Sequence, residues 1–218
     1  MKKIVFLLIL LVIICCGYSS PDEETTGDEG YSIQSLYDFQ KKYVGEEMEV
    51  CSSSSSKTYM DYRAINNTRS KQYKYIQEYM TVDETGLLVD QEGFIGAALG
   101  SYFGKIGDRF YFTLDSGIVL PLVMIDAKAN TDTANGCMQA HDKSVIEFVI
   151  DTNLAAEYFG RFGNGLVLQG NFNNYKLFRG EIVKVEKVTE VVNEKYVTYS
   201  QNEDTYINED IFQYASGY

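Results

Sequence analysis

The sequence predicts a mainly β fold, a small β-barrel with one or two short helices. The chain has 218 residues, which is enough for one well-buried domain with flanking segments. It contains 18 tyrosines and 12 phenylalanines but only two prolines and no tryptophan, a composition that favours strands over a helical bundle. Apolar runs of strand length, separated by turn residues, are concentrated in residues 93–170.

The amino-terminal residues 1–19 are predicted to be a signal peptide or an N-terminal membrane anchor. Two lysines precede an unbroken apolar run at residues 4–16, which has the length of a signal-peptide core and is shorter than the ~20 residues that cross a bilayer. Cleavage after Ser19 and an uncleaved anchor remain open, and a lipid at Cys16 is a third alternative. Each places the chain outside the membrane, secreted or at the cell surface.

Residues 20–56 are polar and acidic and include a run of serines at 52–56, so we predict a flexible spacer with a possible short helix at 31–44. The folded domain is predicted at residues 57–189. An acidic, tyrosine-rich tail of uncertain order follows at 190–218.

The first half of the domain is predicted to hold three strands. Residues 57–65 and 73–80 are rich in aromatic and apolar side chains, and Asn66-Asn67 between them suits a turn or a glycosylation site. Residues 94–99 form a short apolar strand. The glycines that follow it, at positions 100, 104 and 107, allow a tight loop.

A hairpin is predicted at residues 109–125. Residues 109–114 alternate strictly between apolar and polar side chains, and Asp115-Ser116-Gly117 makes a tight turn into a second strand at 118–125. Pro121 indicates an edge or a bulge in that strand, because proline cannot donate to the ladder.

The second half is predicted to begin with a long polar loop at residues 130–143. A strand at 145–150 follows, then a helix at 152–159 capped near Thr152 or Asn153. Strands at 166–168 and 177–188 complete the domain.

Charge and cysteine content exclude some functions. The net charge of −12 and the lack of a basic stripe argue against a nucleic-acid partner, since such affinity depends on Lys and Arg neutralising phosphates. With a single histidine, His141, and no CxxC motif, we predict no metal site and no cofactor. Cys51 and Cys137 either pair or remain free thiols, because the sequence does not reveal their geometry.

Asp126 and Glu147 are the candidate catalytic residues. Asp126 ends the apolar run of residues 118–125, and Glu147 interrupts the run of 145–150. Burial disfavours the charged form of a carboxyl group and can raise its pKa towards neutrality. The alternative is that each acid caps a loop or pairs with Lys128 or Arg109.

The segments LGSYFGKIGDRFYFTL, VLPLVMIDAKA, VIEFVID and AAEYFGRFG occur in an order that resembles the three-aspartate domain of bacterial cell-wall proteins and the barrel of membrane-bound lytic transglycosylase A. The resemblance covers residues 94–170, about a third of the chain. It implies a double-psi β-barrel in which Asp126 matches the aspartate that ends the central strand and Glu147 matches an aspartate of the next strand.

The same resemblance implies a cell-envelope protein that acts on peptidoglycan. Asp126 would be the acid and base that cleaves glycan strands, with Glu147 as its partner. Substrate-binding candidates are Tyr102, Lys128, Asp132 and Asn135, and Phe103 and Tyr111 could also stack on sugars or pack in the core. The alternative is a non-catalytic envelope module that binds wall polysaccharide or a protein partner, and a third reading is a structural surface protein without a ligand.

Overall fold

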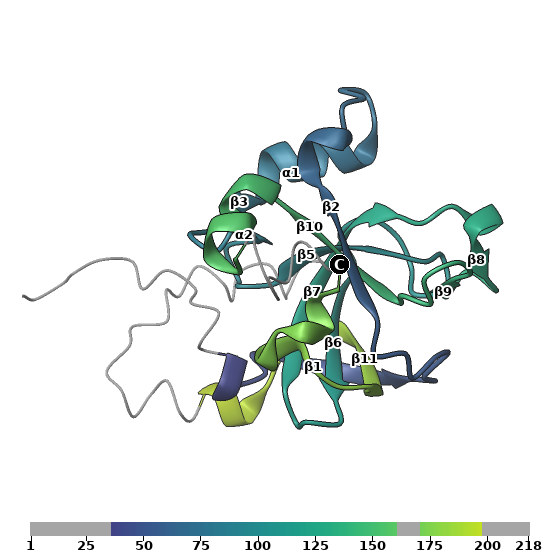
Figure 1. Ribbon diagram of the computed structural model, residues 1–218. Helices are drawn as coiled ribbons and strands as arrows, with labels where there is room; N and C mark the ends of the chain where they lie inside the picture. The colour runs from purple at the N-terminus through teal and green to yellow at the C-terminus, as the bar shows by residue number, and fades with distance from the viewer. Residues whose placement is uncertain (1–35, 161–170, 198–218) are drawn as a thin grey trace, which may run out of the picture. The chain divides into compact units, whose positions relative to one another are not determined.

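The computed structural model describes residues 36–160 and 171–197, all within one compact unit (Figure 1). Its strands are β1 (Tyr43–Met48), β2 (Lys57–Asp61), β3 (Thr81–Val82), β4 (Leu88–Val89), β5 (Ile95–Leu99), β6 (Arg109–Leu114), β7 (Val119–Ala127), β8 (Thr133–Ala134), β9 (Met138–Gln139), β10 (Ile146–Ile150) and β11 (Ile182–Val192). The α-helices are α1 (Lys71–Tyr79) and α2 (Thr152–Tyr158), and the 3-10 helices are η2 (Tyr62–Ala64), η3 (Asn130–Asp132), η4 (Phe172–Asn174) and η5 (Lys176–Phe178). The fold is mainly β, as the composition predicts.

One mixed sheet contains nearly all the strands. Its order is β1-β11-β6-β7-β5-β10-β2; in addition, β4 pairs with the start of β5 and β3 pairs with β4. The pairs β5–β7 and β10–β2 are parallel, and the other pairs along this path are antiparallel. In residues 36–160 and 171–197 the end strands β1 and β2 do not pair with each other, so the predicted barrel is not closed there.

The core has two parts, one on each face of the sheet. Along β7, Leu122 and Met124 belong to the larger cluster, whereas Val123 and Ile125 belong to the smaller one. Ile76 of α1 joins the smaller cluster. We therefore call this side of the sheet the α1 face; in Figure 1, α1 is at the top and the β8–β9 hairpin projects at the side.

The predicted hairpin at 109–125 is confirmed as β6 and β7. Thr113 lies opposite Val119, and Gly117 has the positive φ of 85° that the turn between the strands requires. Pro121 lies within an interior strand, but β7 begins to pair with β5 only at Leu122. The missing N–H of the proline is therefore tolerated because β7 is locally an edge at that residue.

The strand predicted at residues 73–80 is wrong, because residues 73–79 belong to helix α1 and Met80 is its C-cap. The Ser70 side chain accepts a hydrogen bond from the Tyr73 backbone N–H and caps the helix. Its aromatic spacing is helical, since Tyr75 and Tyr79 are four residues apart and their ring centroids are 4.8 Å apart. A run of tyrosines favours a strand locally, but the cap and the apolar contact of Ile76 with the sheet decide otherwise.

Other boundaries also differ from the prediction. Residues 43–48, expected in the spacer with its possible helix at 31–44, form β1 and pair with β11. The last strand starts at Ile182, because residues 176–178 form η5, and it continues to Val192, past the predicted start of the tail. The cap of α2 is Asp151, whose carboxylate accepts the backbone N–H groups of Asn153 and Leu154.

Some predictions fall outside the described residues: the segment 1–19, the strand at 166–168, and the tail from residue 198 onwards. No helix in the part of the chain that the structure describes is long and apolar enough to cross a membrane.

Cys51 and Cys137 form a disulfide, with Cα atoms 6.3 Å apart. Cys137 lies in the predicted loop at 130–143, which contains the β8–β9 hairpin. The disulfide therefore joins this insert to the serine-rich segment before β2. Sequence alone left this pairing open, because it does not reveal the geometry of two cysteines that are 86 residues apart.

Candidate functional site

Asp126 and Glu147 lie in one line across three neighbouring strands. Ala98 of β5 is paired with Asp126 of β7 on one side and with Glu147 of β10 on the other. Residues directly opposite in neighbouring strands point to the same face of a sheet. With strands about 4.8 Å apart, the two acidic residues are about 10 Å apart at the backbone, and the residue between them on β5 is the small Ala98.

A bulge in β7 gives Asp126 this position. Ala97 pairs with Met124, but the next residue, Ala98, pairs with Asp126, so Ile125 is an extra residue in β7. Simple alternation would place Asp126 with Leu122 and Met124, towards the larger core cluster. The bulge brings its carboxyl group to the α1 face instead.

Burial raises the pKa of both acids. For Asp126, desolvation is the largest cause, opposed by hydrogen bonds from the Ala127 backbone and from Gln72 of α1. For Glu147, desolvation is again the largest cause; the charge of Lys128 opposes it, and Asp142 and Asp126 add to the rise. Both side chains are half-buried, so they combine partial desolvation with contact to solvent.

Lys128 lies beside the pair but faces into the protein. It is 8% exposed, and its Nζ donates to the carbonyl oxygen of Ser144 at 3.0 Å and to the Ser144 Oγ at 2.9 Å. Burial lowers the pKa of Lys128, and the charges of Glu147 and Asp142 oppose this effect. Because Ser144 is fully buried, a substrate does not reach its hydroxyl group, and this lysine–serine pair serves to hold the strand ends together.

The other predicted substrate-binding residues form a separate group. Asp132 and Asn135 are exposed on the insert, and Tyr102 is exposed on the loop after β5. The loop and the insert are joined, because the Tyr102 backbone N–H donates to the carbonyl oxygen of Gly136 at 3.0 Å. The hydroxyl of Tyr102 donates to the carbonyl oxygen of Glu49 at 2.9 Å.

The aromatic residues considered for sugar stacking divide in the same way. Phe103 and Tyr111 are 2% and 0% exposed, so they pack in the core and do not meet a ligand. Only Tyr102 of the three presents its ring at the surface.

His141 is exposed, with its Nδ1 3.6 Å from a carboxylate oxygen of Asp142. Within residues 36–160 and 171–197, no cluster of three His, Cys, Asp or Glu side chains could hold a metal ion.

A partly buried ion pair between Asp90 and Arg109 was missed at the level of sequence. Asp90 accepts two hydrogen bonds from Arg109, at 2.9 and 2.7 Å, and the guanidinium group lies over the ring of Phe94. The sequence did contain a signal for the structural role of Asp90, because Asp83 and Asp90 each begin the same D-x-x-G pattern. In the structure, each of these carboxylates accepts hydrogen bonds from the backbone N–H groups two and four residues later. The pattern produces two similar turns, one on each side of β4.

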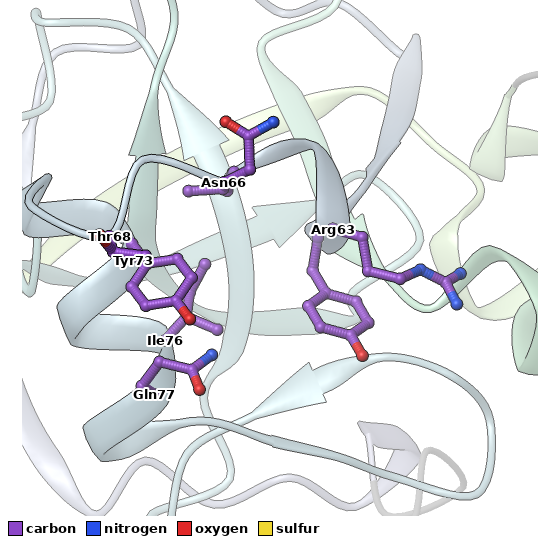
Figure 2. Close-up of a pocket in the computed structure, with 8 residues that line it drawn as sticks. Arg63, Asn66, Thr68, Tyr73, Ile76 and Gln77 are labelled. Carbon is purple, nitrogen blue, oxygen red and sulfur yellow. The ribbon is translucent and has the colours of Figure 1, made fainter.

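A pocket of about 340 Å³ opens between α1 and the segment after β2 (Figure 2). It is lined by Tyr62, Arg63, Ile65, Asn66, Thr68, Tyr73, Ile76 and Gln77. Neither Asp126 nor Glu147 is among these residues. Since Ile76 also packs in the smaller core cluster, the pocket and the acidic pair are on the same face of the sheet.

Comparisons with known proteins give no relative. No protein-family model, no curated protein and no solved structure matches this chain. The site must therefore be interpreted from its own geometry.

Proposed function

We propose that this chain is an exported cell-envelope protein that cleaves the glycan strands of peptidoglycan with one acid/base carboxyl group, Asp126. The observation that carries the proposal is the line Asp126–Ala98–Glu147, in which two half-buried carboxyl groups of raised pKa share one face of the sheet. A raised pKa keeps a carboxyl group protonated closer to neutral pH, as a general acid needs.

The reaction needs no water as nucleophile. Protonated Asp126 gives its proton to the glycosidic oxygen as the bond to the anomeric carbon breaks. The negative charge of Glu147 then stabilises the positive charge that develops on the sugar ring. Asp126, now a carboxylate, takes the proton of the sugar's own primary hydroxyl as that oxygen bonds to the anomeric carbon and closes an anhydro ring, which regenerates the acid.

The double-psi topology belongs to this proposal. It is supported by the two parallel pairings, β5–β7 and β10–β2. Parallel pairs need crossover connections, which an all-antiparallel meander does not contain. It is also supported by the position of Asp126 near the end of β7, the central apolar strand.

Export is supported by the disulfide between Cys51 and Cys137, because such bonds form and persist in oxidising compartments. The apolar run at residues 4–16 would direct export or remain as the only contact with the membrane. We propose peptidoglycan or another envelope polysaccharide as the partner and no nucleic acid, in keeping with the net charge of −12.

A second candidate function is a non-catalytic module that binds wall polysaccharide. It is favoured by the hydrogen bonds from the Ala127 backbone and from Gln72, which favour the ionised form of Asp126. This effect opposes the protonation of Asp126 that acid catalysis requires.

Incubation of the protein with purified peptidoglycan separates these functions. We expect anhydro-sugar products by mass spectrometry from the wild type and none from Asp126→Asn, whereas Asp38→Asn, which alters an exposed aspartate outside the site, should keep full activity. If the wild type gives no product but sediments with the wall, the enzyme proposal is wrong and the binding module stands. If it does neither, both proposals are wrong.

A further inference from the structure

The pocket between α1 and the segment after β2 combines aromatic, apolar and amide side chains. Tyr62 and Tyr73 contribute phenol rings, and Ile65 and Ile76 contribute apolar surface. Asn66, Thr68 and Gln77 contribute polar groups. The pocket lies outside residues 94–170, so it is a different part of the chain from the one that carries the acidic pair.

The polar groups of the pocket are available to a ligand. In the part of the chain that the structure describes, no hydrogen bond occupies the side-chain amides of Asn66 and Gln77 or the hydroxyl of Thr68. Both amides are exposed. An amide side chain donates and accepts hydrogen bonds at once, which matches hydroxyl and acetamido groups.

The charge of the pocket favours an uncharged ligand over an ionic one. Among the lining residues that the structure describes, the only charged side chain is that of Arg63, which donates to both carboxylate oxygens of Asp61 at 2.7 and 2.6 Å. Arg63 also contacts Asp151, and Figure 2 shows its guanidinium group directed away from Tyr73 and Gln77. An anionic ligand would therefore find no uncompensated positive charge, and a cationic ligand would find no carboxylate among the lining residues.

From these features we infer that the pocket binds an uncharged sugar ring. Sugars combine an apolar ring face, which suits tyrosine and isoleucine, with hydroxyl edges, which suit the amides. The volume of about 340 Å³ is at the small end of the range typical of ligand sites, which suits one or two rings. The pocket would hold a glycan next to the sheet face without taking part in its cleavage.

Saturation-transfer NMR with N-acetylglucosamine and its β-1,4 disaccharide tests this inference on the whole protein. We expect saturable binding that Gln77→Ala weakens several-fold and Tyr73→Ala weakens up to about tenfold, the loss of one ring contact. Glucuronate and glucosamine, the charged analogues, should bind more weakly than the neutral sugars.

Tyr79→Ala is the matched control, because Tyr79 is an exposed tyrosine on the same helix and does not line the pocket. Exposed Gln77 gives a variant whose folding is not in question if Tyr73→Ala fails to fold. The inference is overturned if neither neutral sugar binds with a dissociation constant below about 10 mM. It is also overturned if Gln77→Ala and Tyr79→Ala both bind the sugars as tightly as the wild type does. The readout here is sugar binding and not the formation of anhydro-sugar products, so failure of the cleavage proposal would leave this one standing.

Discussion

Removal of the Cys51–Cys137 disulfide should destabilise the whole domain. The bond closes a loop in which the cysteines are 86 residues apart, and it joins the insert that follows β7 to the segment that precedes β2. In the chain-entropy treatment, closing a loop of this length lowers the entropy of the unfolded chain and so raises its free energy by about 4.5 kcal/mol at 25 °C. This is a large fraction of the roughly 5–15 kcal/mol that stabilises a typical domain.

The assay is urea unfolding, followed by circular dichroism, of the oxidised protein, the reduced protein and Cys51→Ser. We expect both forms without the bond to lose between about 2 and 5 kcal/mol, the range found when native disulfides are removed. Reducing agent should have no effect on Cys51→Ser, which controls for other effects of the reagent. Equal unfolding free energies with and without the bond would refute the reasoning and would confine its role to local order of the insert.

Two further predictions concern buried titratable groups. Lys57 is fully buried, its Nζ donates to the carbonyl oxygens of Ser55 and Gly180, and burial lowers its pKa to about 8. Between that value and 10.5 the unfolded state binds more protons than the folded state, so stability rises with pH. The free energy of unfolding of the wild type should therefore increase by up to roughly 3 kcal/mol relative to that of Lys57→Met as pH rises from 8 to 10.5. A constant difference between the two proteins in urea unfolding over that range would contradict this. The pKa of Asp126 is higher in the folded state than its value of 3.8 in the unfolded state. Its contribution to stability is therefore fully present below pH 3.8 and is lost as pH rises through the folded-state pKa. Asp126→Asn should therefore be more stable than wild type in urea at pH 7 and lose that advantage near pH 3, and the opposite order would show that the carboxylate is stabilised by its contacts.

The strands of the sheet's centre could be predicted because their signal is local. The alternation of residues 109–114 and the glycine at the following turn correspond directly to β6 and its connection to β7. Helix α1 could not be predicted in the same way, because tyrosines are common in strands and the capping role of Ser70 depends on the following residues being helical.

The candidate site was predicted in part. Asp126 and Glu147 could be chosen because each is an acid within a dense apolar run, and the structure places both on one face. Lys128 was expected to meet substrate, but its contact with Ser144 turns it inward. Gln72 had no signal at all, since α1 was expected to be a strand.

The sequence by itself determined the β-rich class, the central hairpin and the two acids to test, because these follow from side-chain pattern within a few residues. The tertiary structure alone decided that Ala98 separates the two acids, that the bulge at Ile125 turns Asp126 towards α1, and that Cys51 meets Cys137. Pairing between distant strands sets these relations, and one inserted residue reverses the face of every residue after it. No local pattern in β7 shows which register its neighbours will adopt.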